Sequence, residues 1–308
     1  MATTNVVLQP GTAPETPTID FETTKEVGFY QLVWRRFAKR KLALGAMGVL
    51  LVLAVACALG PVLLPAEHVD PTHAGLGPFQ GGHILGTDDI GRDLLLRNLS
   101  GGRISLAVGG LAMLLTIAIA TLLGAMSGFF GGLVDTIVSA LTNALLSIPS
   151  ILILVVFAKA FGQSIQTIVI GIALLAWPYT ARIVRAVVLS VREKEFVEAA
   201  KALGTPRWRI MIRHLIPNAL GPIVVSASLT IGAAILLESA LSFLGVGIGQ
   251  PTATWGSLLN QGYQELNSGA VGFFYSLWPG LLILVTVLSF NYIGDALRDA
   301  FDPRSLER

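Results

Sequence analysis

The chain has 308 residues, of which 53% are hydrophobic and only 13% are charged, and its mean hydropathy is +0.71. A soluble globular domain carries about 25% charged residues, so this composition excludes an ordinary water-soluble protein. The formal net charge of +2 conceals an asymmetry, because most Lys and Arg residues fall before residue 42, between 182 and 213, or after residue 297.

The segment before the first apolar run divides into two parts. Residues 1–27 are rich in Thr, Pro and Glu and poor in apolar side chains, which predicts a disordered cytoplasmic tail. Residues 28–41 mix aromatic with basic side chains, a pattern typical of a helix at the inner membrane interface. A simple basic flank for the following segment explains these charges equally well.

Six uncharged apolar windows are each long enough to cross a bilayer, which requires about 20 residues. They cover residues 42–64, 104–128, 136–158, 160–181, 215–237 and 273–294. Cytoplasmic loops carry an excess of Lys and Arg, so both termini and the 182–213 loop are predicted to lie inside. We predict an all-α polytopic membrane protein with six transmembrane helices, an external loop at 65–103, a core domain at 104–298 that holds five of the helices, and a cytoplasmic tail at 299–308.

No pattern in the chain indicates catalysis or a bound cofactor. There is no Gly-Lys dipeptide, which a phosphate-binding loop requires, and no histidine falls within a predicted span. The external loop holds His68, His73 and His83, but their spacing is not that of a metal site. We therefore predict no enzyme activity, no metal and no cofactor on this chain.

Polar residues within the predicted spans are candidates for a translocation path. Five uncharged ones face a cavity or form hydrogen bonds across helices: Asn143, Ser147, Ser150, Ser226 and Ser228. The sixth candidate, Glu238, lies near the outer end of the fifth span. For Glu238, a helix-end carboxylate that reaches external water or a backbone partner is favoured over a contact with substrate.

The cytoplasmic loop at 191–217 has the pattern of two short helices separated by a glycine. Apolar residues recur at helical spacing from Phe196 to Leu203, and Glu195 and Glu198 fall in the first turn, where the helix dipole favours acidic residues. Gly204 then ends the first helix. A basic second segment follows, with Arg207, Arg213 and His214, and Pro217 marks the next span. The small side chains of Ala199 and Ala200 allow another surface to approach closely.

The order Glu198-Ala199-Ala200, Gly204 and Pro217 resembles the EAA loop of ABC importer permeases, in which the glycine is six and the proline nineteen residues after the glutamate. His214 and Ile216 depart from the general pattern in a way usual in the peptide branch. Three further segments resemble the second permease subunit of dipeptide, oligopeptide and nickel importers. They are Leu85–Asp93, Glu238–Gly245 with Pro251 and Trp255-Gly256, and Gly294–Pro303.

This resemblance implies a type I importer permease in a prokaryotic inner membrane. It implies four kinds of partner: a similar but distinct permease, two ATPase subunits that bind ATP and Mg²⁺, an extracellular solute-binding protein and the lipid bilayer. Nucleic acid is not among them. The coupling residues would be Glu195, Glu198, Ala199, Ala200, Leu203, Gly204, Arg207, Arg213, His214 and Pro217. Peptides are the expected cargo, with nickel chelates or oligosaccharides as an alternative and an ion-gradient-driven carrier as a more remote one.

Overall fold

The computed structural model describes residues 29–64, 69–249, 251–268 and 270–302, and within them it is helical, with two isolated β-bridges and no strand. The elements are α1 (Phe29–Lys39), α2 (Lys41–Leu63), η1 (Pro71–His73), α3 (Leu94–Phe130), α4 (Gly132–Leu146), α5 (Ser150–Phe161), α6 (Ile165–Arg192), α7 (Glu195–Ala202), α8 (Arg207–Ile210), η2 (Met211–Leu215), α9 (Ile216–Asn218), α10 (Leu220–Phe243), α11 (Trp255–Gln264), η3 (Glu265–Ser268) and α12 (Ala270–Phe301).

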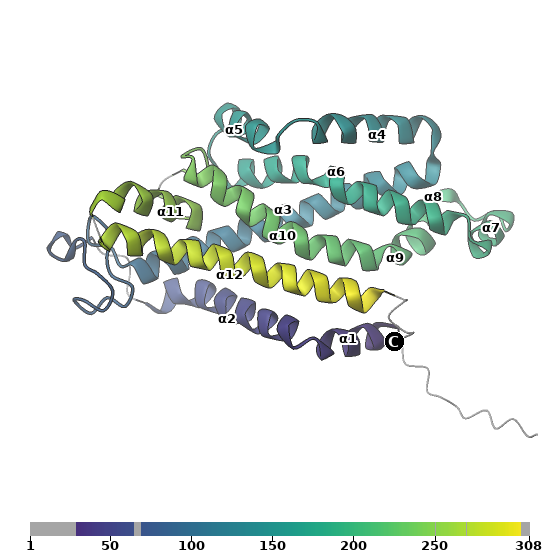
Figure 1. The fold of residues 1–308 in the computed structure, drawn as a ribbon. Helices are drawn as coiled ribbons and strands as arrows, with labels where there is room; N and C mark the ends of the chain where they lie inside the picture. The colour runs from purple at the N-terminus through teal and green to yellow at the C-terminus, as the bar shows by residue number, and fades with distance from the viewer. Residues whose placement is uncertain (1–28, 65–68, 250, 269, 303–308) are drawn as a thin grey trace, which may run out of the picture.

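Five of these helices are long and apolar enough to cross a membrane, namely α2, α3, α6, α10 and α12. They run roughly along one direction, with α7 at one end and the 69–93 loop and α11 at the other (Figure 1). The expectation of an all-α membrane protein is therefore confirmed. The basic residues cluster toward the α7 end, so that end is cytoplasmic.

The prediction that residues 136–158 form one continuous membrane-spanning helix was wrong. The structure divides it into α4 and α5, which are bent by 90° at a break of a few residues, so there are six spans only if this pair counts as one. The break contains Pro149, which has no backbone N–H to continue the helix and disfavours helical geometry in the residue before it. Composition conceals this break, because Ile148 and most residues of α5 are apolar.

The second span is longer than its apolar window, 104–128. α3 begins at Leu94, where the carboxylate of Asp93 accepts a hydrogen bond from the backbone N–H of Leu96 at 3.0 Å and caps the helix. With 37 residues it is about 55 Å long. The helix therefore extends into the segment predicted as external loop, and it runs through the middle of the bundle (Figure 1).

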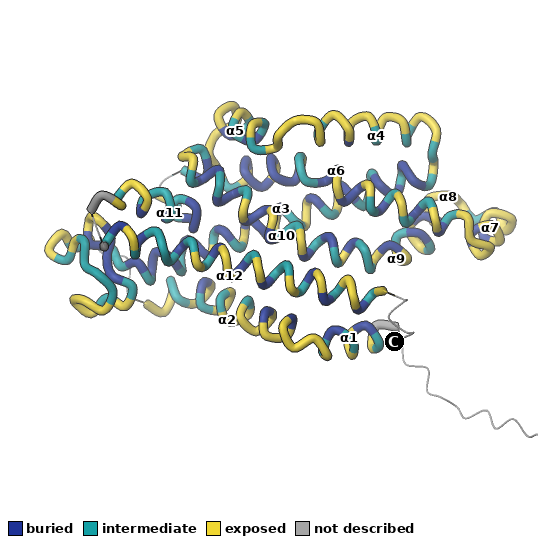
Figure 2. The backbone as a smooth tube through the Cα atoms, viewed as in Figure 1, coloured by how far each residue is buried: buried dark blue, intermediate teal, exposed yellow. Residues whose placement is uncertain are grey.

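The α3 and α6 helices pack closely because α3 presents glycines to its partner. A Cβ on Gly124 would lie 2.6 Å from the carbonyl oxygen of Ala181, and one on Gly128 would lie 2.9 Å from that of Arg185. Small residues at such contacts let two backbones approach within a membrane. Figure 2 shows buried residues concentrated along these central helices, whereas α4 is mostly exposed.

The segment predicted as an interfacial helix at 28–41 contains α1, which lies beside the cytoplasmic end of α12. Its buried Val33 and Phe37 pack against Ala296 and Ala300. Arg40 also forms an exposed ion pair with Asp299 at 2.6 Å. α12 continues through Phe301, into the predicted tail at 299–308. The predicted disordered segment, 1–27, lies outside the described residues.

Candidate coupling segment and cavity

The cytoplasmic loop at 191–217 is called the coupling segment below. Its first half forms a short helix, α7, which is anchored by two buried side chains. Val197 and Ala200 belong to one apolar cluster with Val184, Val188 and Val191 of α6. The same cluster contains Ile210, Met211 and Leu215 from the second half of the segment. The segment is therefore packed onto the end of α6 as an ordered structure.

Gly204 ends this helix as its pattern predicts. Its φ is +74°, a left-handed conformation that favours glycine. The backbone N–H of Thr205 donates to the carbonyl of Ala200 at 3.0 Å, and that of Leu203 to Ala199 at 3.0 Å. These bonds satisfy carbonyls that the helix end would otherwise leave without partners.

The exposed surface of the coupling segment carries both apolar and charged residues. Leu203 is 86% exposed and Trp208 is 56% exposed, although both are large and apolar. Glu195, Glu198 and Ala199 are exposed on α7 itself. Large apolar side chains exposed at a polar cytoplasmic end are typical of a surface that binds another protein.

The second half of the coupling segment passes from an α-helical to a π-helical turn and back, and these turns contain the remaining predicted coupling residues. After α8, which begins at Arg207, a π-helical turn, η2, contains Arg213 and His214, and Pro217 lies within the following turn, α9. His214 is half-buried near the ring of Phe196, with the ring centroids 6.1 Å apart. Arg207, Arg213 and Pro217 remain exposed. Such π-helical turns are rare and occur frequently at functional sites.

The coupling segment connects α6 to α10, and these two helices line a cavity of about 720 Å³. The walls are mostly apolar, with hydroxyl groups from Tyr179, Thr180, Ser226 and Thr230. Arg298, Phe301 and Asp302, at the cytoplasmic end of α12, contribute to the lining. A volume of this size lies within the range of small-molecule sites, about 300–1,000 Å³.

The six candidate path residues lie in different places. Ser226 lines the cavity. Ser228 instead donates to the carbonyl of Val225 at 2.8 Å and faces α12, where a Cβ on Gly294 would lie 2.8 Å from its hydroxyl. The other uncharged candidates are exposed on the α4–α5 pair, which does not contribute to the lining of this cavity: Asn143, Ser147 and Ser150.

The prediction that Glu238 reaches external water or a backbone partner was wrong. Its exposed fraction is 0%, and its carboxylate accepts hydrogen bonds from the hydroxyls of Ser242 at 2.7 Å and Ser105 at 3.2 Å. The oxygen of Ser105 also accepts from the backbone N–H of Trp255 at 3.2 Å. The carboxylate is therefore enclosed between α3 and α10, beside the start of α11, because serine hydroxyls supply the donors that a buried polar group needs.

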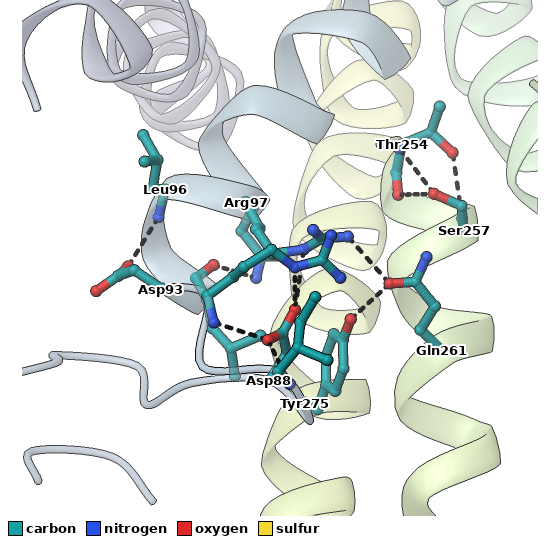
Figure 3. Close-up of polar contacts among 12 residues, drawn as sticks. Asp88, Asp93, Leu96, Arg97, Thr254, Ser257, Gln261 and Tyr275 are labelled. Carbon is teal, nitrogen blue, oxygen red and sulfur yellow. Dashed lines mark hydrogen bonds and ion pairs between the residues drawn. The ribbon is translucent and has the colours of Figure 1, made fainter. Parts of the chain in front are cut away.

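The segment Leu85–Asp93 forms an external cap around the buried carboxylate of Asp88. This carboxylate accepts from the backbone N–H groups of Ile90 and Arg92 at 3.1 and 2.8 Å and pairs with the Arg92 guanidinium at 2.6 Å. Arg97 also approaches this carboxylate, with its Nε 3.7 Å from Oδ2 (Figure 3). The cap thus covers the external end of α3.

The external cap is joined to two further helices through Gln261. The amide oxygen of Gln261 accepts from Arg97 at 3.0 Å and from the Tyr275 hydroxyl at 2.6 Å (Figure 3). Sequence reasoning missed this network, although Asp88 and Arg92 stand four residues apart as an ion pair often does. At the start of the described loop, hydrogen bonds from Thr72 and His73 lower the pKa of Asp70 to about 2. Among the described residues, no three His, Cys, Asp or Glu side chains form a group that fits a metal ion.

Comparison with known proteins places this architecture among membrane components of importers. Residues 120–307 match the family described as binding-protein-dependent transport system inner membrane component, and residues 28–78 match the N-terminal TM domain of oligopeptide transport permease C. The oligopeptide transport system permease protein OppC of Escherichia coli is 42% identical over 273 residues, which cover 88% of this chain and 89% of that protein.

A second relative agrees with this family match, and a solved structure shares the fold. The dipeptide transport system permease protein DppC of Bacillus subtilis is 38% identical, and the match covers 90% of this chain and 87% of that protein. A solved chain of the MetNI methionine ABC transporter, in an inward-facing conformation, aligns with a TM-score of 0.54 at 22% identity. The alignment covers 68% of this chain and 97% of the MetNI chain. At this identity the likeness shows a shared fold.

Proposed function

Because this chain belongs to the family of binding-protein-dependent transport system inner membrane components, we propose that it is a permease subunit of an ATP-driven importer of di- and oligopeptides. It would form half of the translocation path together with a similar permease. Two ATPase subunits would bind ATP and Mg²⁺ on the cytoplasmic side, and an extracellular binding protein would deliver the peptide.

The observation that carries this proposal is the continuity between the coupling segment and the cavity walls. α6 leads into α7 after only two residues, and α9 leads into α10 through Ala219 alone. Since α6 and α10 line the cavity, a displacement of the coupling segment is transmitted to both walls. A partner that binds the exposed face of α7 can therefore change the shape of the cavity without touching it.

The mechanism follows from the rigidity of this connection. Val197 and Ala200 fix α7 to the end of α6, so ATP-driven closure of the ATPase subunits would move α7 and the inner end of α6 as one unit. The chain itself would contribute no chemical step. Its residues would hold the peptide between the cavity walls, and the ATPase subunits would supply the free energy that changes the accessibility of the cavity.

The lining of the cavity suits peptides of varied sequence. Its apolar walls accommodate different side chains, while the hydroxyls of Thr180, Ser226 and Thr230 provide donors and acceptors for peptide N–H and C=O groups. The relatives that support peptide as cargo are named for oligopeptide and dipeptide transport. No feature of the cavity favours nickel chelates or oligosaccharides, and the family match does not favour an ion-gradient carrier.

The proposal is tested by the ATPase activity of the complete complex in lipid with its binding protein. Peptides of two to several residues, Ni²⁺ chelates and oligosaccharides are compared as the added cargo. We expect stimulation by peptides and its loss in Glu198→Arg, with the variant still inserted in the membrane. Stimulation by a different cargo class would overturn the peptide assignment, and stimulation unaffected by Glu198→Arg would overturn the role of α7.

A further inference from the structure

The α4 helix has a backbone break at each end, so its position depends on side-chain contacts. At its start, Gly131, the one residue between α3 and α4, and Gly132, the first residue of α4, have φ values of +67° and +53°. At its end, the chain turns by 90° into α5 at Pro149. Glycines and helix ends of this kind are where a chain can absorb large changes in backbone angles.

Apolar packing holds α4 along a narrow stripe. In its fifteen residues the buried side chains are Val138 and Thr142. Its opposite side exposes Leu133, Ile137 and Leu141. Figure 2 shows the same asymmetry along the helix. The contacts that determine where α4 sits must therefore include its polar ones.

The carboxylate of Asp135 provides most of these polar contacts, and one further side-chain hydrogen bond, from Arg182 on α6 to the amide oxygen of Asn143 at 2.7 Å, also joins α4 to α6. The Oδ1 of Asp135 accepts from the Nε of Arg185 on α6 at 2.6 Å, and its Oδ2 accepts from the Nη2 of the same residue at 2.7 Å. The hydroxyl of Ser127, on α3, donates to Oδ1 at 2.5 Å. Paired bonds between guanidinium and carboxylate are strong and fix orientation as well as distance. Asp135 thus joins α4 to two other helices through one group.

The two helices that Asp135 contacts belong to the unit that carries the coupling segment. The close approach at Gly124 and Gly128 packs α3 against α6, and Arg192 donates to the carbonyl of Gly128 at 2.9 Å. Ala125 of α3 and Val197 of α7 lie in one buried cluster with residues of α6. α3, α6 and α7 therefore form one packed body at the cytoplasmic end.

We propose that Asp135 is a positioning residue that makes α4 follow the packed body of α3, α6 and α7, so that movement of the coupling segment is passed to the bent α4–α5 pair. The glycines at one end and the bend at Pro149 at the other permit α4 to change its angle, and the Asp135–Arg185 pair determines that angle. Without the pair, the coupling segment still moves α6, but only the Arg182–Asn143 hydrogen bond and the apolar stripe remain to make α4 follow it, so α4 follows less closely.

The test uses Asp135→Asn, which keeps the size of the side chain and removes its charge, in the complete complex in lipid. We expect ATP hydrolysis to continue while the amount of peptide imported per ATP falls about fivefold or more, the lower range of measured coupling effects. The matched control is Thr136→Ala, because the Thr136 hydroxyl donates only within α4, to Gly132 at 3.0 Å. The double variant Asp135→Arg with Arg185→Asp exchanges the two charges and should restore part of the peptide imported per ATP hydrolysed.

A distance measurement separates this role from a loss of fold. Spin labels at Ile137 and Leu174 report the α4–α6 distance, and labels at Leu114 and Leu174 report the α3–α6 distance, all at exposed positions. Asp135→Asn should broaden the first distribution and leave the second unchanged. An unchanged α4–α6 distribution would overturn the inference, and so would equal broadening of both distributions.

The transport readout rests on the proposed function, whereas the distance readout does not. If the unaltered complex imports no peptide, the proposed function fails. The inference about Asp135 is then decided by the distances alone. If the unaltered complex imports peptide but α4 stays in place in Asp135→Asn, the inference fails and the proposed function stands.

Discussion

The hydroxyl of Ser105 donates a hydrogen bond of 3.2 Å to the carboxylate of Glu238, across 133 positions of sequence. This bond joins α3 to α10 at a point where both residues are buried. Because Ser105 also accepts from the backbone of Trp255, the start of α11 is held by the same pair. The arrangement makes Glu238 a structural link between α3 and α10, one of the cavity-lining helices, at the external side of the bundle.

Glu238→Ala should destabilise the protein more than Glu238→Gln. The alanine leaves the hydroxyls of Ser105 and Ser242 without their acceptor in a buried site, at a cost of about 1–3 kcal/mol for each unsatisfied group. Glutamine retains an acceptor oxygen of similar position. Thermal unfolding of the purified protein in detergent measures the difference. Equal midpoints for the two variants would mean that these hydrogen bonds do not hold the helices together.

Gly124→Ala should weaken the packing of α3 against α6, whereas Gly110→Ala should not. A Cβ at Gly124 would lie 2.6 Å from the carbonyl oxygen of Ala181, which is backbone and cannot move aside, while a Cβ at Gly110 has nothing within 4 Å. Overpacking of this kind costs about 1–3 kcal/mol, but alanine in an open helical position is favoured over glycine by up to about 1 kcal/mol. The two variants should therefore shift the unfolding midpoint in opposite directions, and a shared direction would contradict the close contact.

Features that depend on neighbouring residues can be predicted from this sequence, whereas contacts between distant residues cannot. Apolar windows and charge asymmetry were sufficient to predict an all-α membrane protein, and the glycine after α7 was predicted from local pattern, because each depends on neighbouring residues. The bend at Pro149 was missed, since the apolar composition continues through it. Ser105, which binds Glu238 from α3, and Arg185, which binds Asp135 from α6, lie 133 and 50 positions away along the chain. No periodicity within one helix indicates such pairs.

The exposure of Leu203 predicts a separation between stability and partner binding within the coupling segment. Leu203→Ser should leave the unfolding midpoint nearly unchanged, because the side chain is 86% exposed, yet weaken association with the ATPase subunits. Val197→Ala should instead lower the unfolding midpoint before it affects association with the ATPase subunits. Val197 is fully buried, and its truncation costs on the order of 1–3 kcal/mol. Co-purification of the ATPase and thermal unfolding, measured on both variants, check the pair. If Val197→Ala loses the ATPase and Leu203→Ser retains it, Leu203 is not part of the surface that binds the ATPase subunits.

Filling the cavity should block transport without releasing the ATPase. Ala233 lines the cavity on α10, whereas Leu236 is an exposed residue of the same helix that does not contribute to the lining. Ala233→Trp places a large ring in the space between α6 and α10, so we expect peptide uptake to fall about tenfold or more while ATPase co-purification is retained, since tenfold corresponds to only about 1.4 kcal/mol. Leu236→Trp adds the same ring elsewhere on the helix and should have little effect. Uptake in proteoliposomes distinguishes them, and normal uptake by Ala233→Trp would show that peptides do not pass through this cavity.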